Sequence, residues 1–298
     1  MIQINSLTKR FEEVIAVNSL DLTINEGITG LVGHNGAGKS TLFRLIANVY
    51  QYDSGEILIN GLDSQSDKGK AQVFFLSDNP YVLSNATPSG MLNFYQGFFD
   101  IDEEKFKTLI AKFAIPENRK VVNFSKGMKR QLFIALALSS SCPILLLDEA
   151  FDGLDPLALE IIKDEIIKIS QDNRTIVISS HNISVLERLC DTFVFLNKGK
   201  LSKHADACDI GNTFNKYQGL FKQPITKEMF EEIGINVVSF KKIGSLYNIV
   251  ISGELNEQDV KKKFEATLFE KIPIDSAEIF ALEMLDAKKN EEDLINEK

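Results

Sequence analysis

The residues most able to do chemistry form the segment GHNGAGKST at positions 33–41. An apolar run (ITGLV, 28–32) precedes it and a helical pattern (TLFRLIANVY) follows it, which predicts a strand, a loop and a helix in that order. Glycines let backbone N–H groups curl around a phosphate without Cβ clashes, and the helix N-terminus adds partial positive charge. The segment therefore predicts a phosphate-binding loop of the G-x-x-x-x-G-K-[ST] type, rather than a glycine-rich turn that arose by chance. Its predicted binding residues are Gly33, His34, Asn35, Gly36, Ala37, Gly38, Lys39, Ser40 and Thr41.

Two of these side chains have distinct predicted tasks. Lys39 would reach the β- and γ-phosphates of a nucleotide, and the Ser40 hydroxyl would ligate Mg²⁺. The sequence ILLLDE at 144–149 offers a second ligand, because a buried strand that ends in two acids needs a partner for its charge. Asp148 is predicted to hold Mg²⁺, directly or through water, and Glu149 to polarise an attacking water. The alternative for Glu149 is a helix cap or a lysine partner.

The elements that would position these residues alternate along the first 200 residues, as in a layered α/β domain. Residues 20–24 and 55–59 alternate with period two, which predicts half-exposed antiparallel strands. Residues 28–32, 144–147, 175–178 and 192–196 are short aliphatic runs, which are typical of strands buried on both faces. Asp155 and Pro156 are predicted to open a helix as its cap and its first residue.

The 298 residues suggest two domains, with a change of pattern after about residue 200. We predict a first domain over 1–218 and a C-terminal accessory module over 219–298. In the module, Thr226 and Asn256 can each cap a short helix, and the runs NVVSF and LYNIVIS can pair as strands. The module is predicted to be a small α+β fold that ends in a charged tail.

Composition excludes several classes of protein. The 33 basic and 42 acidic side chains give a net charge of −9, which counts against a nucleic-acid partner. No apolar run approaches the roughly 18 residues of a membrane span, and no signal peptide is expected at the N-terminus. The three cysteines lie far apart without a C-x-x-C pattern, so we expect ordinary reduced thiols rather than a metal site or disulfides.

Further motifs give the chain a family resemblance. Residues 124–131 (FSKGMKRQ) precede a long apolar helix, DGLD occupies 152–155, and His181 follows the strand TIVISS. With Phe11, the phosphate loop and the paired acids, the chain resembles ATP-binding cassette (ABC) proteins over roughly residues 1–215. The resemblance implies an α/β P-loop NTPase cassette with an antiparallel β subdomain and a helical signature subdomain. It also implies two cassettes paired head to tail, with each ATP between one phosphate loop and the partner's signature.

The resemblance assigns roles that have simpler alternatives. The signature residues Ser125, Lys126, Gly127 and Met128 would meet the γ-phosphate of the partner's ATP, although Ser125 can equally be an ordinary helix cap. Asp155 would belong to the D-loop. His181 would contact the γ-phosphate as a catalytic residue, or would serve only as a structural hydrogen-bonding group. Phe11 would stack on adenine, or would belong to the core.

Three positions depart from the family's pattern. His34 replaces a proline of the phosphate loop, which leaves the backbone donors intact, and Met128 replaces a glutamine, as in many members. Asp78 occupies the position of the Q-loop glutamine. A carboxylate there can still ligate Mg²⁺, so the coupling role of the loop is what this departure puts in doubt.

We therefore expect an ATPase subunit of an ABC transporter, with ATP and Mg²⁺ as cofactors. Its expected partners are integral membrane permease subunits and a second cassette, which is either a copy of itself or a paralogue. We expect it in the cytoplasm, peripheral on the inner face of the plasma membrane. The C-terminal pattern IPIDSAEIFALE resembles that of exporters. The alternative is a soluble ABC ATPase of translation or DNA maintenance, which the acidic charge and the lack of a second phosphate loop disfavour.

Overall fold

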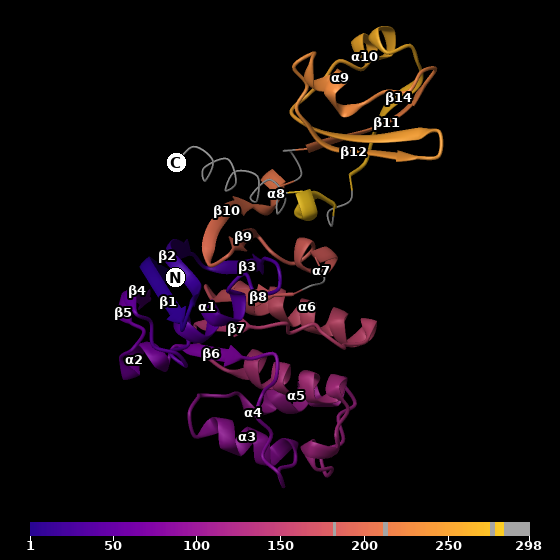
Figure 1. The fold of residues 1–298 in the computed structure, drawn as a ribbon. Helices are drawn as coiled ribbons and strands as arrows, with labels where there is room; N and C mark the ends of the chain where they lie inside the picture. The colour runs from indigo at the N-terminus through magenta and orange to yellow at the C-terminus, as the bar shows by residue number, and fades with distance from the viewer. Residues whose placement is uncertain (181–182, 211–213, 275–277, 283–298) are drawn as a thin grey trace. The chain divides into compact units, whose positions relative to one another are not determined.

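The computed structural model describes residues 1–180, 183–210, 214–274 and 278–282 (Figure 1). The chain divides into two compact units, one over Met1–His204 and one that begins at Ala205. Each unit has its own sheets and its own hydrophobic core.

The first unit is built around a six-stranded sheet with the order β10-β9-β3-β8-β7-β6. The pairs β9–β3, β3–β8, β8–β7 and β7–β6 are parallel. The four runs predicted as doubly buried strands are central in this sheet, and nearly all their residues are buried, which confirms that prediction. The strands are β3 (Gly27–Val32), β6 (Val73–Leu76), β7 (Ile144–Leu147), β8 (Thr175–Ser179), β9 (Thr192–Asn197) and β10 (Lys200–Asp206).

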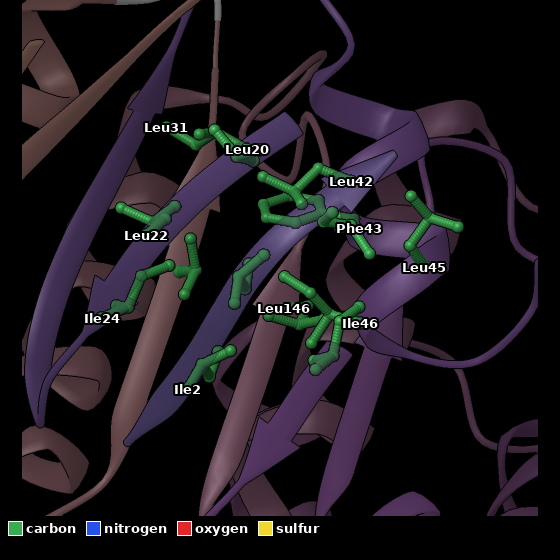
Figure 2. Close-up of a cluster of buried hydrophobic side chains, with 14 of the residues drawn as sticks. Ile2, Leu20, Leu22, Ile24, Leu31, Leu42, Phe43, Leu45, Ile46 and Leu146 are labelled. Atoms are coloured by element: carbon green, nitrogen blue, oxygen red, sulfur yellow. The ribbon is translucent and has the colours of Figure 1, made fainter. Parts of the chain in front are cut away.

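A second sheet in this unit is antiparallel, with the order β2-β1-β4-β5. Its strands are β1 (Ile2–Phe11), β2 (Val14–Ile24), β4 (Ser54–Ile59) and β5 (Leu62–Asp63), and they include the two runs predicted as half-exposed. One hydrophobic cluster joins both sheets to helix α1 (Lys39–Ile46), and it includes Leu22 of β2, Phe43 of α1 and Leu146 of β7 (Figure 2). This packing fixes the helix that follows the phosphate loop.

Of the remaining helices of the first unit, α2 contacts β5 of the antiparallel sheet, and the others flank the parallel sheet or form a separate group (Figure 1). Helices α3 and α4 pack against α5, whose first residue follows Ser125, so these three make up the helical subdomain. The Asp155 side chain accepts a hydrogen bond from the Ala158 amide at the start of α6, which confirms the predicted cap. The helices are α2 (Asp67–Lys70), α3 (Pro88–Gln96), α4 (Glu103–Lys112), the 3₁₀ helix η1 (Val121–Asn123), α5 (Lys126–Ser139), α6 (Pro156–Ser170) and α7 (Ile183–Glu187).

The second unit contains a four-stranded antiparallel sheet with the order β12-β13-β11-β14. In chain order it runs strand, helix, strand, strand, helix, strand, which is the ferredoxin-like arrangement. Asn256 caps the second helix as predicted, by accepting a hydrogen bond from the Gln258 amide, whereas Thr226 precedes the first helix without a capping hydrogen bond from its side chain. The elements are α8 (Ala207–Ile210), β11 (Phe214–Phe221), α9 (Lys227–Glu231), β12 (Val237–Ile243), β13 (Leu246–Ser252), α10 (Glu257–Lys263) and β14 (Ala266–Ile272).

The boundary between the units lies earlier than the sequence pattern suggests. The expected boundary at residue 218 falls inside β11, which pairs with β13 and β14 and is therefore a central strand of the second sheet. The structure instead divides the chain between His204 and Ala205. Lys216, Gln218 and Gly219 interrupt the apolar pattern of β11, and this is why the strand is hard to recognise in the sequence.

The three cysteines all lie within the described residues and form no disulfide, as expected. Cys142 and Cys190 are buried, and burial raises the pKa of both thiols. Cys208 is exposed on the second unit.

Candidate functional site

The predicted phosphate loop connects the end of β3 to the start of α1. Gly36 and Gly38 have φ values of +81° and +105°, which glycine adopts without strain. A Cβ on Gly38 would lie 2.5 Å from the Ala16 carbonyl oxygen, so only glycine fits there. No side chain caps α1, and its first-turn N–H groups therefore remain available to a phosphate.

A pocket of about 430 Å³ opens over this loop. Seven of the nine predicted loop residues line it, together with Asp78 and Glu149 and two residues of β2 that were not predicted. The lining residues are Val14, Ala16, His34, Asn35, Gly36, Gly38, Lys39, Ser40, Thr41, Asp78 and Glu149. The pocket is therefore suited to a polyphosphate that approaches the loop from its open side.

Lys39 is the buried cation of this pocket. Its Nζ donates to the carbonyl oxygens of Gly33 at 2.7 Å and His34 at 3.3 Å. Burial lowers the pKa of the Lys39 ammonium, and the negative charges of Glu149 and Asp148 act in the opposite direction. An anionic ligand in the pocket would favour the charged form in the same way as these carboxylates.

Asp148 is fully buried at the end of β7. Its Oδ1 accepts a hydrogen bond from Ser179 Oγ at 2.7 Å, whereas its Oδ2 has no hydrogen-bond partner among the described residues. An unsatisfied buried carboxylate oxygen is costly, and a cation is the ligand that would satisfy it. Asp148 and the Ser40 hydroxyl therefore fit a Mg²⁺ ion whose remaining ligands come from phosphate oxygens and water.

Glu149 turns the chain sharply after β7, with a φ of +48°. Its amide N–H donates to Ser179 Oγ at 3.0 Å. The Ser179 hydroxyl thus donates to Asp148 and accepts from Glu149, which holds both acids in place. Ser179 was not predicted from the sequence. Its position at the end of β8, a buried strand beside β7, is the one signal that could have found it.

Asp78 lines the same pocket from the segment after β6. One oxygen of its carboxylate lies 3.7 Å from Arg44 Nη2 on α1, and 53% of its side-chain surface is exposed. Arg130 of α5 donates to the backbone carbonyls of Ser77 and Asp78, at 3.0 and 2.7 Å. The segment is therefore tied to the phosphate-loop helix by a side chain and to the signature helix by its backbone.

The predicted signature residues lie at the start of α5 and do not line the phosphate pocket among the residues that the structure places. Ser125 caps α5 by accepting a hydrogen bond from the Met128 amide at 3.2 Å. A Cβ on Gly127 would lie 2.8 Å from the Gly153 carbonyl oxygen, so the first turn of α5 packs closely on the D-loop. Lys126 Nζ lies 3.6 Å from Asp152 Oδ2. Signature and D-loop therefore form one surface of the chain.

Asp155 strengthens that junction. One carboxylate oxygen caps α6, and the other accepts from Gln131 Nε2 of α5 at 3.2 Å. Both oxygens are thus used within the chain, which gives Asp155 a structural role beside the one the resemblance implies.

The two remaining predicted residues are Phe11 and His181. Phe11 is exposed, contacts Tyr50 edge to face at 5.4 Å, and is absent from the described lining of the phosphate pocket, where Val14 and Ala16 provide the apolar wall. His181 lies outside the described residues.

Comparison with known proteins gives consistent matches. Residues 17–152 match the family model described as ABC transporter. The chain is 26% identical to the ABC transporter ATP-binding protein YtrB of Bacillus subtilis (strain 168) over 289 residues, which cover 94% of this chain and 97% of YtrB. It is 30% identical to the ABC transporter ATP-binding protein NatA of the same strain over 216 residues, covering 67% of this chain and 87% of NatA. A solved structure described as an ATP binding subunit of an ABC transporter superimposes with a TM-score of 0.66 at 25% identity, over 70% of this chain and 91% of that one.

Proposed function

The chain belongs to the family of ABC transporter ATP-binding proteins, and we propose from this that its ATPase cycle drives a membrane-spanning permease. In the proposed cycle, each ATP is held between the phosphate pocket of one copy and the signature surface of a second. The observation that carries this proposal is the separation of Ser125–Met128 from the lining of the phosphate pocket. In this proposal, the γ-phosphate site is completed only by a second chain.

The chemistry within the site follows from the residues that line it. Lys39 and the loop amides bind the β- and γ-phosphates, and Asp148 with Ser40 would hold Mg²⁺, which supplies charge neutralisation on the phosphates. Glu149 lines the same pocket, and its proposed role is to orient a water and accept its proton. Ser179 orients the Asp148 carboxylate and holds the backbone of Glu149.

The second-chain site can be tested through the cap of α5. Aspartate caps helices as well as serine does, so Ser125→Asp keeps the fold but places a negative charge where the partner's γ-phosphate would lie. With ATP, we expect light scattering to show a dimer for the single variant Glu149→Gln, which keeps Ser125. The double variant Glu149→Gln/Ser125→Asp should be a monomer. Both forms should bind ATP equally as monomers.

Ser125→Asn is the matched control, since it keeps the cap without the charge. It should dimerise far better than the aspartate variant. A dimer that forms equally well with aspartate would contradict the shared site, and so would a Glu149→Gln chain that stays monomeric with ATP at concentrations well above micromolar.

The proposed permease partner is supported by an exposed aromatic pair in the helical subdomain. Phe94 of α3 and Phe98 just after it are 41% and 67% exposed, with their ring centroids 5.3 Å apart. Exposed aromatic clusters mark protein or membrane interaction sites. No helix in the described ranges is both long and apolar enough to cross a bilayer. The proposal includes attachment to the inner face of the membrane through the permease partner.

For the direction of transport we propose export. The support is the resemblance of the pattern at 272–283 to exporter subunits; residues 275–277 and 283 of it lie outside the described residues. A complex reconstituted in vesicles with this chain outside should accumulate substrate in the lumen when ATP is added. Release of preloaded substrate instead would indicate import.

A further inference from the structure

The sheet of the second unit has one face covered by helices and one face that is open over part of its length, since Phe214 and Val250 at one end of that second face are buried. Helices α9 and α10 both lie on the same side of it (Figure 1). The apolar cluster under them includes Tyr217, Tyr247, Ile249 and Phe269 from the strands and Phe230 from α9. Because side chains alternate along a strand, the intervening residues of all four strands point to the other face.

The open face carries an apolar row that crosses the whole sheet. Ile243 of β12 pairs with Leu246 of β13, and Leu220 of β11 pairs with Leu268 of β14. Leu220 follows Gly219, which is paired with Tyr247, so Leu220 and Leu246 are neighbours in register. None of these four side chains is buried, and Ile243 is 64% exposed. The row is thus a continuous strip of aliphatic side chains, with Ile243 and Leu268 exposed at its ends and Leu220 and Leu246 partly exposed between them.

The next row on the same face consists of four polar residues, of which only the two at its ends are charged. Lys241 pairs with Asn248, Asn248 with Gln218, and Gln218 with Glu270. Gln218 Nε2 donates to Asn248 Oδ1 at 3.2 Å, while Lys241 and Glu270 are exposed at opposite edges. One row further along, Lys216 is paired with Glu278 at 2.5 Å, so that part of the face is already in contact with the chain's own residues.

These two rows are complementary to themselves. A two-fold axis parallel to the strands, placed between β13 and β11, reverses the strand order of a facing copy. Each row then meets the same row read backwards. Lys241 of each copy faces Glu270 of the other, which gives two pairs of opposite charge. Asn248 of each copy faces Gln218 of the other, and the two aliphatic rows face each other. Aligned sheets pack about 10 Å apart, which long lysine and glutamate side chains can bridge.

We propose that this face is a contact surface for the same face of a second copy of the chain. The pairing is isologous, as in most two-fold dimers. Charge complementarity favours this occupant, because any other orientation of the two rows brings unpaired or like charges together. The surface would thereby favour pairing of this chain with itself over pairing with a paralogous cassette.

The contact is weak on its own. The two rows contribute four residues each, far fewer than the roughly 20–30 residues per side of a standard interface. When ATP brings two cassettes together, the second units become mutually tethered at an effective concentration of about millimolar, and a weak contact then adds to the stability of the dimer.

A charge swap in the full chain tests this. In the Glu149→Gln background with ATP, Lys241→Glu places glutamates opposite Glu270 of the second copy, and sedimentation should show a dimer dissociation constant raised by about tenfold. The double variant Lys241→Glu/Glu270→Lys restores opposite charges and should return the constant to within about twofold of the starting value. Ile243→Ser, at an exposed position, should also weaken the dimer.

Lys262→Glu is the matched control, since it makes the same charge change on α10, on the covered side of the sheet, and should have no effect. An unchanged constant for Lys241→Glu would overturn the proposal. Weakening without rescue by the double variant would also overturn it, since the face would then meet something other than its own copy. If the Glu149→Gln chain fails to dimerise with ATP, the proposed cassette pairing fails instead. The same variants, compared without nucleotide at several hundred micromolar, still decide whether the open faces associate.

Discussion

Glu149→Gln is expected to lower the rate of ATP hydrolysis by about 10²–10⁴-fold and to leave ATP binding intact. Glutamine keeps the shape of the side chain and one acceptor oxygen, but it cannot take the proton of an attacking water. The backbone turn is unaffected, since both residues adopt the φ of +48° equally well and the amide still donates to Ser179. Single-turnover hydrolysis, measured beside ATP affinity, checks the two expectations together.

Asp78 is the rival base, because its carboxylate lines the same pocket. The structure makes it a poor one: it lies 3.7 Å from the Arg44 guanidinium and is half exposed. We therefore expect Asp78→Asn to retain most of the single-turnover rate. Near-normal turnover in Glu149→Gln with collapse in Asp78→Asn would move the base to Asp78.

Lys39→Ala is expected to weaken ATP binding by about ten- to a hundredfold. Charge-assisted hydrogen bonds to phosphate contribute roughly 1.5–3 kcal/mol each, which corresponds to that range of affinity. Lys39 already lies in the loop, where its ammonium donates to two backbone carbonyls and can turn to a phosphate without unfolding anything. Isothermal calorimetry with MgATP is the direct measurement.

Lys39→Met separates charge from volume, because methionine fills much of the same space without an ammonium. We expect it to bind ATP as weakly as the alanine variant. Lys68→Ala, at an exposed lysine of α2 outside the pocket, should bind ATP normally. Equal affinity for the wild type and both Lys39 variants would refute the assignment of this loop.

The sequence predicts those parts of the site that are contiguous in it. Lys39 and Ser40 follow the glycines directly, and Asp148 and Glu149 end one buried strand, so local pattern is enough to find them. Ser179 is different, because it reaches Asp148 only through the parallel register that pairs Leu147 with Ile178. No spacing along the chain encodes that register. Phe11 shows a different limit, because its base-stacking role rests on its position in a motif alone. The ring is exposed beside Tyr50, and the role stays a prediction.

The fold shows the same division. The aliphatic runs of β7 and β8 are recognisable as strands in the sequence, because strands buried on both faces are apolar along nearly their whole length. Helices α3 and α4 are not evident from the pattern, although Thr87 and Asp102 cap them, since their apolar positions are few and their faces mixed. Because one face of β11 is polar, this central strand was not recognised in the sequence, and the expected domain boundary was placed inside it.

The distribution of thiols has a practical consequence. Cys142 and Cys190 are buried, while Cys208 is exposed at the start of the second unit. A maleimide fluorophore added to the unmodified chain will therefore react at one position per molecule, without any cysteine having to be introduced or removed. Donor- and acceptor-labelled copies mixed in solution then carry one dye each on the second unit. Energy transfer between them reports how closely two such units approach as nucleotide is added, in real time.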